Sequence, residues 1–114
     1  MGLFRRKPPA VADDGDHAVL IHFALADDAF GNEAERTTIG DLGDRLADIV
    51  QRAEVGEFDG DEFGGGEAVL YLYGPDEEHL WATVEPEVRA CALRPAFALL
   101  RPGGPNAAAH RLEL

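Results

Sequence analysis

The order of the hydrophobic segments along this chain predicts an α+β fold with one antiparallel sheet and two helices. Segments with the two-residue period of strands are interspersed with two segments whose apolar residues recur every three or four positions, as in amphipathic helices. The 114 residues include 46% hydrophobic and 28% charged residues, a balance that suits one domain with one core. We therefore expect a flexible tail at residues 1–16 and a single domain at residues 17–114.

The first strand is predicted at residues 17–25, where both faces are largely apolar, as in an interior strand. One face has Val19, Ile21, Phe23 and Leu25, and the other has Ala18, Leu20, His22 and Ala24. Residues 27–36 are polar and are interpreted as a connecting loop with room for a short helical turn.

An amphipathic helix is predicted from Thr38 onward, since its apolar residues form one stripe. The stripe consists of Ile39, Leu42, Leu46, Ile49, Val50 and Ala53. Thr38 and Asp41 resemble a capping box, and Gly56 is a plausible stop.

The second half of the chain repeats the pattern with two strands, a helix and a strand. Strands are expected around residues 56–63 and, most clearly, at residues 67–73. Asp76 is a natural N-cap for a helix in which Pro86 predicts a kink or break near residues 82–85. The buried stripe of this helix is expected to contain Leu80, Trp81, Val84, Val88 and Cys91. Strands at residues 96–101 and 110–114 complete the chain.

This βαββαβ order is that of the ferredoxin-like plait, in which two helices cover one face of an antiparallel sheet. The first and third strands are then the central pair. Assigning their larger aliphatic side chains to the helices leaves five residues on the opposite face, namely Leu20, His22, Val69, Tyr71 and Tyr73, with Phe97 or Leu99 as further members. They are candidate ligand-binding or interface residues.

Such an apolar surface is rarely left in water. Two copies packed sheet to sheet would cover it and would form a cleft with His22 near the tyrosines. A helix or the tail of the same chain would cover it equally well, and the sequence leaves these alternatives open.

An acidic glycine-rich loop is predicted between the second and third strands. Its residues are Asp59, Asp61, Glu62, Gly64, Gly65, Gly66 and Glu67. The favoured interpretation is a flexible or bulged hairpin. A phosphate cradle is disfavoured by the carboxylates, and a calcium loop by the missing spacing of acidic ligands.

Other residue types limit the chemistry. Serine is absent, which removes every serine-nucleophile mechanism. The four histidines have no metal-ligand spacing, so we expect no metal and no cofactor, and the single cysteine, Cys91, is interpreted as a core residue. The absence of a signal-peptide pattern favours the cytoplasm.

The run DGDEFGGGEAVLYLYGPD at residues 59–76 resembles a stretch in small bacterial proteins of ferredoxin-like type with no assigned function. The resemblance implies the fold and brings no activity, cofactor or catalytic residue. Nine of the ten basic residues are arginine, as is typical of GC-rich bacterial genomes.

The net charge of −12 disfavours nucleic acid and anionic membranes as partners. It favours a small interaction module, homodimeric through its open sheet, that binds a basic protein, for example as an antagonist or immunity-type protein. The alternative is a small-molecule binding protein or an enzyme whose dimer cleft is lined by His22, Tyr71 and Tyr73, with His22 as the acid or base.

Overall fold

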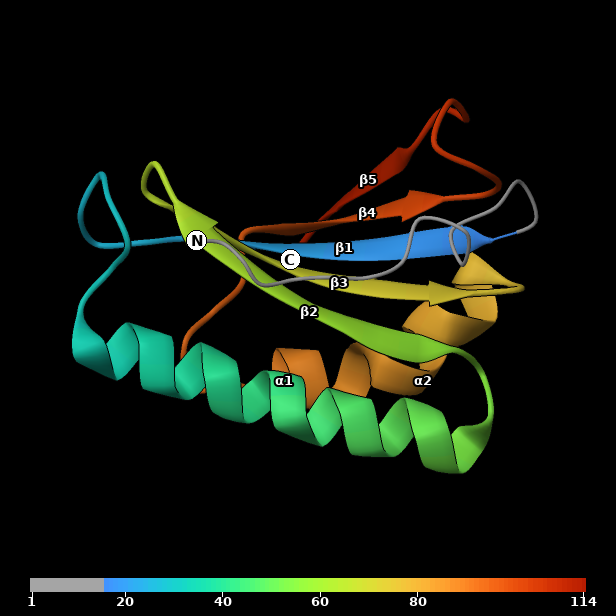
Figure 1. Ribbon diagram of the computed structural model, residues 1–114, viewed down its shortest axis with the longest axis horizontal. Helices are drawn as coiled ribbons and strands as arrows, with labels where there is room; N and C mark the ends of the chain where they lie inside the picture. The colour runs from blue at the N-terminus through green and yellow to red at the C-terminus, as the bar shows by residue number, and fades with distance from the viewer. Residues whose placement is uncertain (1–15) are drawn as a thin grey trace.

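The computed structural model describes residues 16–114, so the tail predicted at residues 1–16 falls almost entirely outside the described residues. Strands and helices follow one another in the expected order, including the short last strand predicted at residues 110–114 (Figure 1). The elements are β1 (His17–Ala24), α1 (Glu33–Ala53), β2 (Glu57–Gly64), β3 (Glu67–Gly74), α2 (Glu77–Arg89), β4 (Phe97–Arg101) and β5 (His110–Glu113).

The five strands form one antiparallel sheet in the order β2-β3-β1-β4-β5. Both helices lie against the same face, and the other face carries no helix (Figure 1). The fold is therefore the predicted α+β ferredoxin-like plait, extended by β5 beside β4. As expected, β1 and β3 are neighbours in the middle of the sheet, with Ile21 opposite Leu70.

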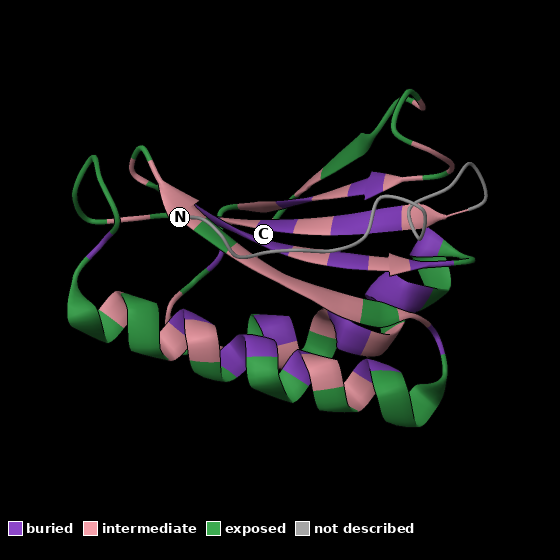
Figure 2. Cartoon of the chain, viewed as in Figure 1, coloured by how far each residue is buried: buried purple, intermediate pink, exposed green. Residues whose placement is uncertain are grey.

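The core lies between the sheet and the helices, as Figure 2 shows by the buried positions on both layers. Val19, Ile21 and Phe23 of β1 are completely buried together with Leu70 and Leu72 of β3. The helices contribute completely buried residues as well, which are Ile39, Leu42, Leu46, Val50, Leu80, Val84 and Val88. Burying one such side chain contributes about 1.5–3 kcal/mol. The predicted assignment of the larger aliphatic residues to the helix side is confirmed.

Helix α1 begins earlier than its apolar stripe predicts. Asn32 is the N-cap: its side-chain oxygen accepts from the backbone N–H of Glu35 at 2.8 Å, and the Glu35 carboxylate accepts from the backbone N–H of Asn32 at 2.9 Å. The capping box predicted at Thr38 and the loop predicted to residue 36 are therefore wrong. The first turn is polar, so it adds nothing to the hydrophobic period, and capping chemistry alone marks the true start. The helix ends at Ala53 with Glu54 in the left-handed conformation, φ 58°, ahead of Gly56.

Pro86 does not break the second helix, which runs without interruption from Glu77 to Arg89. The proline removes the backbone donor that would bond the carbonyl of Ala82. Ala82 is exposed, so water can bond this carbonyl instead. The predicted N-cap is confirmed, since the Asp76 carboxylate accepts from the backbone N–H groups of the first turn. Cys91 lies just after the helix and packs, half-buried, against the core.

Candidate functional site on the open sheet face

We define the open face as the side of the sheet opposite the helices, and the strand register gives its members. They are Glu57 and Glu62 on β2, Glu67, Val69, Tyr71 and Tyr73 on β3, Ala18, Leu20 and His22 on β1, Phe97, Leu99 and Arg101 on β4, and Arg111 and Glu113 on β5. All five predicted candidates lie on this face, with Leu20 opposite Tyr71 and His22 opposite Val69. Their placement agrees with the sequence analysis, which makes the open face the candidate site.

His22 is held by two contacts on this face. Its Nδ1 lies 2.6 Å from a carboxylate oxygen of Glu67, and its ring stacks on Phe97 with centroids 4.3 Å apart and planes inclined by 15°. The Arg111 guanidinium covers the Phe97 ring at 3.7 Å from its centroid and pairs with Glu113. We call these four residues the His22 row. The row crosses four strands, from the carboxylate of Glu67 on β3 through His22 and Phe97 to the guanidinium of Arg111 on β5.

One nitrogen of the His22 row, Nε2 of His22, makes no hydrogen bond to the described residues. A carboxylate only accepts hydrogen bonds, so Nδ1 of His22 carries the proton of the bond to Glu67. Nε2 is buried and has no hydrogen-bond partner among the described residues. It presents a lone pair when the imidazole is neutral and an N–H when the imidazole is charged. A ligand group at this position would bond a histidine that Glu67 already orients.

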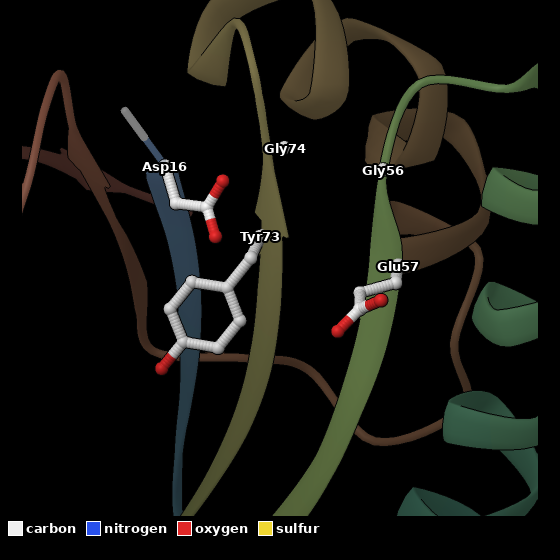
Figure 3. Close-up of a pocket in the computed structure, with 5 residues that line it drawn as sticks. All are labelled: Asp16, Gly56, Glu57, Tyr73 and Gly74. Atoms are coloured by element: carbon white, nitrogen blue, oxygen red, sulfur yellow. The ribbon is translucent and has the colours of Figure 1, made fainter. Parts of the chain in front are cut away.

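The two tyrosines lie in different surroundings. The Tyr71 hydroxyl donates to the Glu62 carboxylate at 2.8 Å. Tyr73 lines a hollow at the end of β3 together with Asp16, Gly56, Glu57 and Gly74 (Figure 3).

Along the sheet, Tyr73 is opposite Ala18 whereas His22 is opposite Val69, so four residues, about 13 Å of strand, separate the Tyr73 hollow from the His22 row. His22 and Tyr71 are not among the residues that line this hollow. The structure thus divides the predicted His22 and tyrosine group between two places.

The triple glycine forms the turn of the β2–β3 hairpin. Gly65 and Gly66 are its two central residues and have φ values of 62° and 82°, as a tight primed turn requires. The turn also contacts the loop after β1, because the N–H of Gly66 donates to the carbonyl of Ala29 at 2.8 Å and the N–H of Leu25 donates to the carbonyl of Gly66 at 2.9 Å. Turn geometry and backbone packing therefore account for these glycines. The predicted bulge lies between Phe58 and Asp61.

The loop that receives the turn is organised by one carboxylate. Asp27 accepts from the backbone N–H groups of Ala29 at 3.0 Å and Gly31 at 2.8 Å. These bonds stabilise the ionised form and hold the pKa of Asp27 below its ordinary value. Within residues 16–114, no group of three or more histidine, cysteine, aspartate or glutamate side chains is placed to hold a metal ion.

Charge is distributed unequally across the sheet. Residues 53–88 contain no lysine or arginine but half of the 22 carboxylates of the chain. These are Glu54, Glu57, Asp59, Asp61, Glu62, Glu67, Asp76, Glu77, Glu78, Glu85 and Glu87. Much of this segment forms the hairpin whose outer strand, β2, is one edge of the sheet, whereas Arg101 and Arg111 lie on β4 and β5 at the other edge.

Glu57, Arg101 and Arg111 are not among the residues predicted from the sequence. The net charge of −12 is a total, and a total conceals the difference in charge between the two edges. The gap in basic residues between Arg52 and Arg89 is the signal from which the polarity could have been found.

Comparisons with known proteins give no relative: no family model matches the chain, and neither the curated proteins nor the solved structures contain a match. The resemblance at residues 59–76 stays a prediction. None of the described helices is long and apolar enough to cross a membrane.

Proposed function

We propose that the protein is an acidic interaction module that binds a basic protein through the carboxylates of the β2 edge. The observation that carries the proposal is the absence of lysine and arginine from residues 53–88, a segment that includes β2, an edge strand with four carboxylates and no cationic side chain. Such a field accelerates the encounter with a positively charged partner and disfavours acidic ones. An antagonist or immunity-type protein that covers a basic surface is one specific form of this activity.

Helix α1 differs from the β2 edge in the distribution of its charges, so it provides a suitable control. On α1 the carboxylates are interleaved with arginines, and Asp48 pairs with Arg52 at 2.9 Å. Arg45 of the same helix pairs with Glu87 of α2 at 2.6 Å. The carboxylates of α1 are therefore partly neutralised by neighbouring arginines, whereas all charged residues of β2 are acidic.

The test compares two triple variants with the same net charge. The first neutralises β2 (Asp59→Asn, Asp61→Asn, Glu62→Gln), and the second neutralises α1 (Asp41→Asn, Asp44→Asn, Asp48→Asn). Each immobilised protein captures partners from a lysate of its native cells at low salt, and mass spectrometry quantifies what a salt gradient releases. We expect wild type and the α1 variant to retain the same basic protein and the β2 variant to lose it at least tenfold. Equal retention by both variants, or no basic protein at low salt, refutes the proposal.

A second candidate function is the binding of a small molecule at His22. The supporting observation is the buried Nε2 without a partner, on an imidazole oriented by Glu67. Tyr73 lies too far along the sheet to share this position, since it lines a separate hollow about 13 Å away. NMR of ¹⁵N-histidine-labelled protein during addition of a fragment library tests it: a ligand should shift the Nε2 resonance of His22, and a Glu67→Gln variant should weaken that shift. A library that leaves His22 unperturbed counts against this function.

A further inference from the structure

The open face has opposite charges on its two halves. Glu57, Glu62 and Glu67 lie on the β2–β3 half. Arg101 and Arg111 lie on the β4–β5 half, where Glu113 is paired with Arg111. Between the halves lies an apolar strip that consists of Ala18 and Val69, which are buried within the chain, and Leu20 and Leu99, which are half-buried. A surface with an apolar middle and opposite charges at its two sides is complementary to itself.

The strand order determines how a second copy fits. Because β1 is the middle of the five strands, a two-fold axis parallel to β1 places β2 of one copy over β5 of the other. A two-fold axis across the strands would instead place β2 over β2 and the carboxylates over one another. Like charges brought together in this way cost several kcal/mol. We propose that the open face binds a second copy of this chain about a two-fold axis parallel to β1.

The register identifies the charged pair that this axis brings together. Glu57 is opposite Tyr73, Tyr73 is opposite Ala18, and Ala18 is opposite Arg101, so all four lie in one row across the sheet. The axis keeps the position along the strands and reverses the order across them. Because the axis at β1 exchanges β3 with β4, Arg101 of each copy lies over Tyr73 of the other copy, and Glu57 lies one strand spacing, about 4.8 Å, further out in the same row. Within one chain, three strand spacings, about 14 Å, separate Glu57 from Arg101.

Leu20 and Leu99, which are half-buried in the single chain, supply the apolar surface that this association would bury, since Ala18 and Val69 are already buried. Packed sheets lie about 10 Å apart with interdigitated side chains, so Leu20 and Ala18 of the central strand would lie at the axis. The tyrosine rings flank them, and the charged residues form a polar rim, as in typical protein interfaces. The interface is isologous, which closes the assembly at two copies.

The test uses charge reversal in the full chain. Light scattering after size-exclusion chromatography over a range of concentrations gives the dimer Kd of wild type, of Glu57→Arg and of Arg101→Glu. Each variant replaces two attractions per dimer by two repulsions, so we expect each Kd to rise at least tenfold. In an equimolar mixture of the two variants, both pairs are again attractive, and we expect a heterodimer close to wild-type strength. Recovery on mixing also establishes that both variants are folded.

Matched controls lie on the helix side, where Arg45 and Glu87 form an ion pair within one chain. Charge reversals there, Arg45→Glu and Glu87→Arg, should leave the dimer Kd unchanged. A wild-type mass of one copy at all concentrations would overturn the proposal, and protection of the open face from hydrogen exchange in that monomer would assign the cover to the same chain. A mass that grows beyond two copies, or variants that fail to recover on mixing, would also overturn it.

Discussion

Alanine at Gly66 should destabilise the protein more than alanine at Gly65, although both residues have a positive φ and occupy the same turn. An alanine in the left-handed conformation costs about 1–2 kcal/mol, and this cost is common to both positions. At Gly65 an added Cβ meets no atom within 4 Å. At Gly66 it lies 3.0 Å from the carbonyl oxygen of Asp27 and 3.2 Å from the Cα of Asp28, both of which belong to the backbone.

The extra cost at Gly66 follows from what has to move. The backbone of the loop after β1 is held to the turn by the bonds of Gly66 to Ala29 and Leu25, so relieving the contact strains both. Overpacking of this kind typically costs about 1–3 kcal/mol. We therefore expect a loss of about 1–2 kcal/mol for Gly65→Ala and about 2–5 kcal/mol for Gly66→Ala.

Urea unfolding followed by circular dichroism gives both free energies from the midpoint and the slope. In a domain of this size, a difference of 1 kcal/mol also moves the thermal midpoint by about 4–8 °C. Equal losses at the two positions would mean that positive φ alone explains the glycines. A larger loss at Gly65 would refute the assigned contact between the turn and the loop.

Three further perturbations test local features. Asn32→Ala removes the α1 cap and should cost about 1 kcal/mol in urea unfolding, whereas no loss would reject the capping box. Gly74→Ala places a Cβ 2.3 Å from the carbonyl oxygen of Val55 and should cost about 1–3 kcal/mol, and a neutral result would disprove that close approach. The lowered pKa of Asp27 stabilises the fold above the pKa of the unfolded chain, and this contribution is lost as the pH falls through the lower folded value. Unfolding free energies at pH 7 and pH 3 should therefore differ less in Asp27→Ala than in wild type, and equal pH dependence would contradict the assignment.

The strands and their faces are predictable from the sequence because period two is a direct property of the pleat. Val19, Ile21 and Phe23 alternate with Ala18, Leu20 and His22, and the larger side chains of the first set favour its assignment to the helix side, where the structure buries it completely. The start of α1 is harder to predict from the sequence, since its first turn contains no buried residue and so adds nothing to the hydrophobic period. Only the side-chain bonds between Asn32 and Glu35 identify it, and these depend on geometry.

The composition of the open face is predictable, but its organisation is not. His22 could be assigned to this face from alternation, yet its stacking on Phe97 and the cover by Arg111 depend on the pairing of β1 with β4 and of β4 with β5. Periodicity within one segment contains no information about which strand lies beside it. For the same reason, the opposite charges of the two sheet edges appear only when the strand order is known.

Binding of a basic protein at the β2 edge and dimerisation through the open face use different parts of the sheet. The second copy would cover the open face, whereas the outer edge of β2 points away from the rest of the sheet and stays accessible. The two-fold axis would place the two acidic edges at opposite sides of the dimer, each beside the Arg101 end of the other copy. A dimer of this kind offers two equivalent sites for a basic protein. In the dimer the second copy would cover Glu57 and Glu62 on the open face, whereas Asp61 lies opposite Leu70 on the helix side of the same strand. Of the three carboxylates neutralised in the β2 variant, Asp59 and Asp61 are therefore the ones expected to contribute most to capture of the partner.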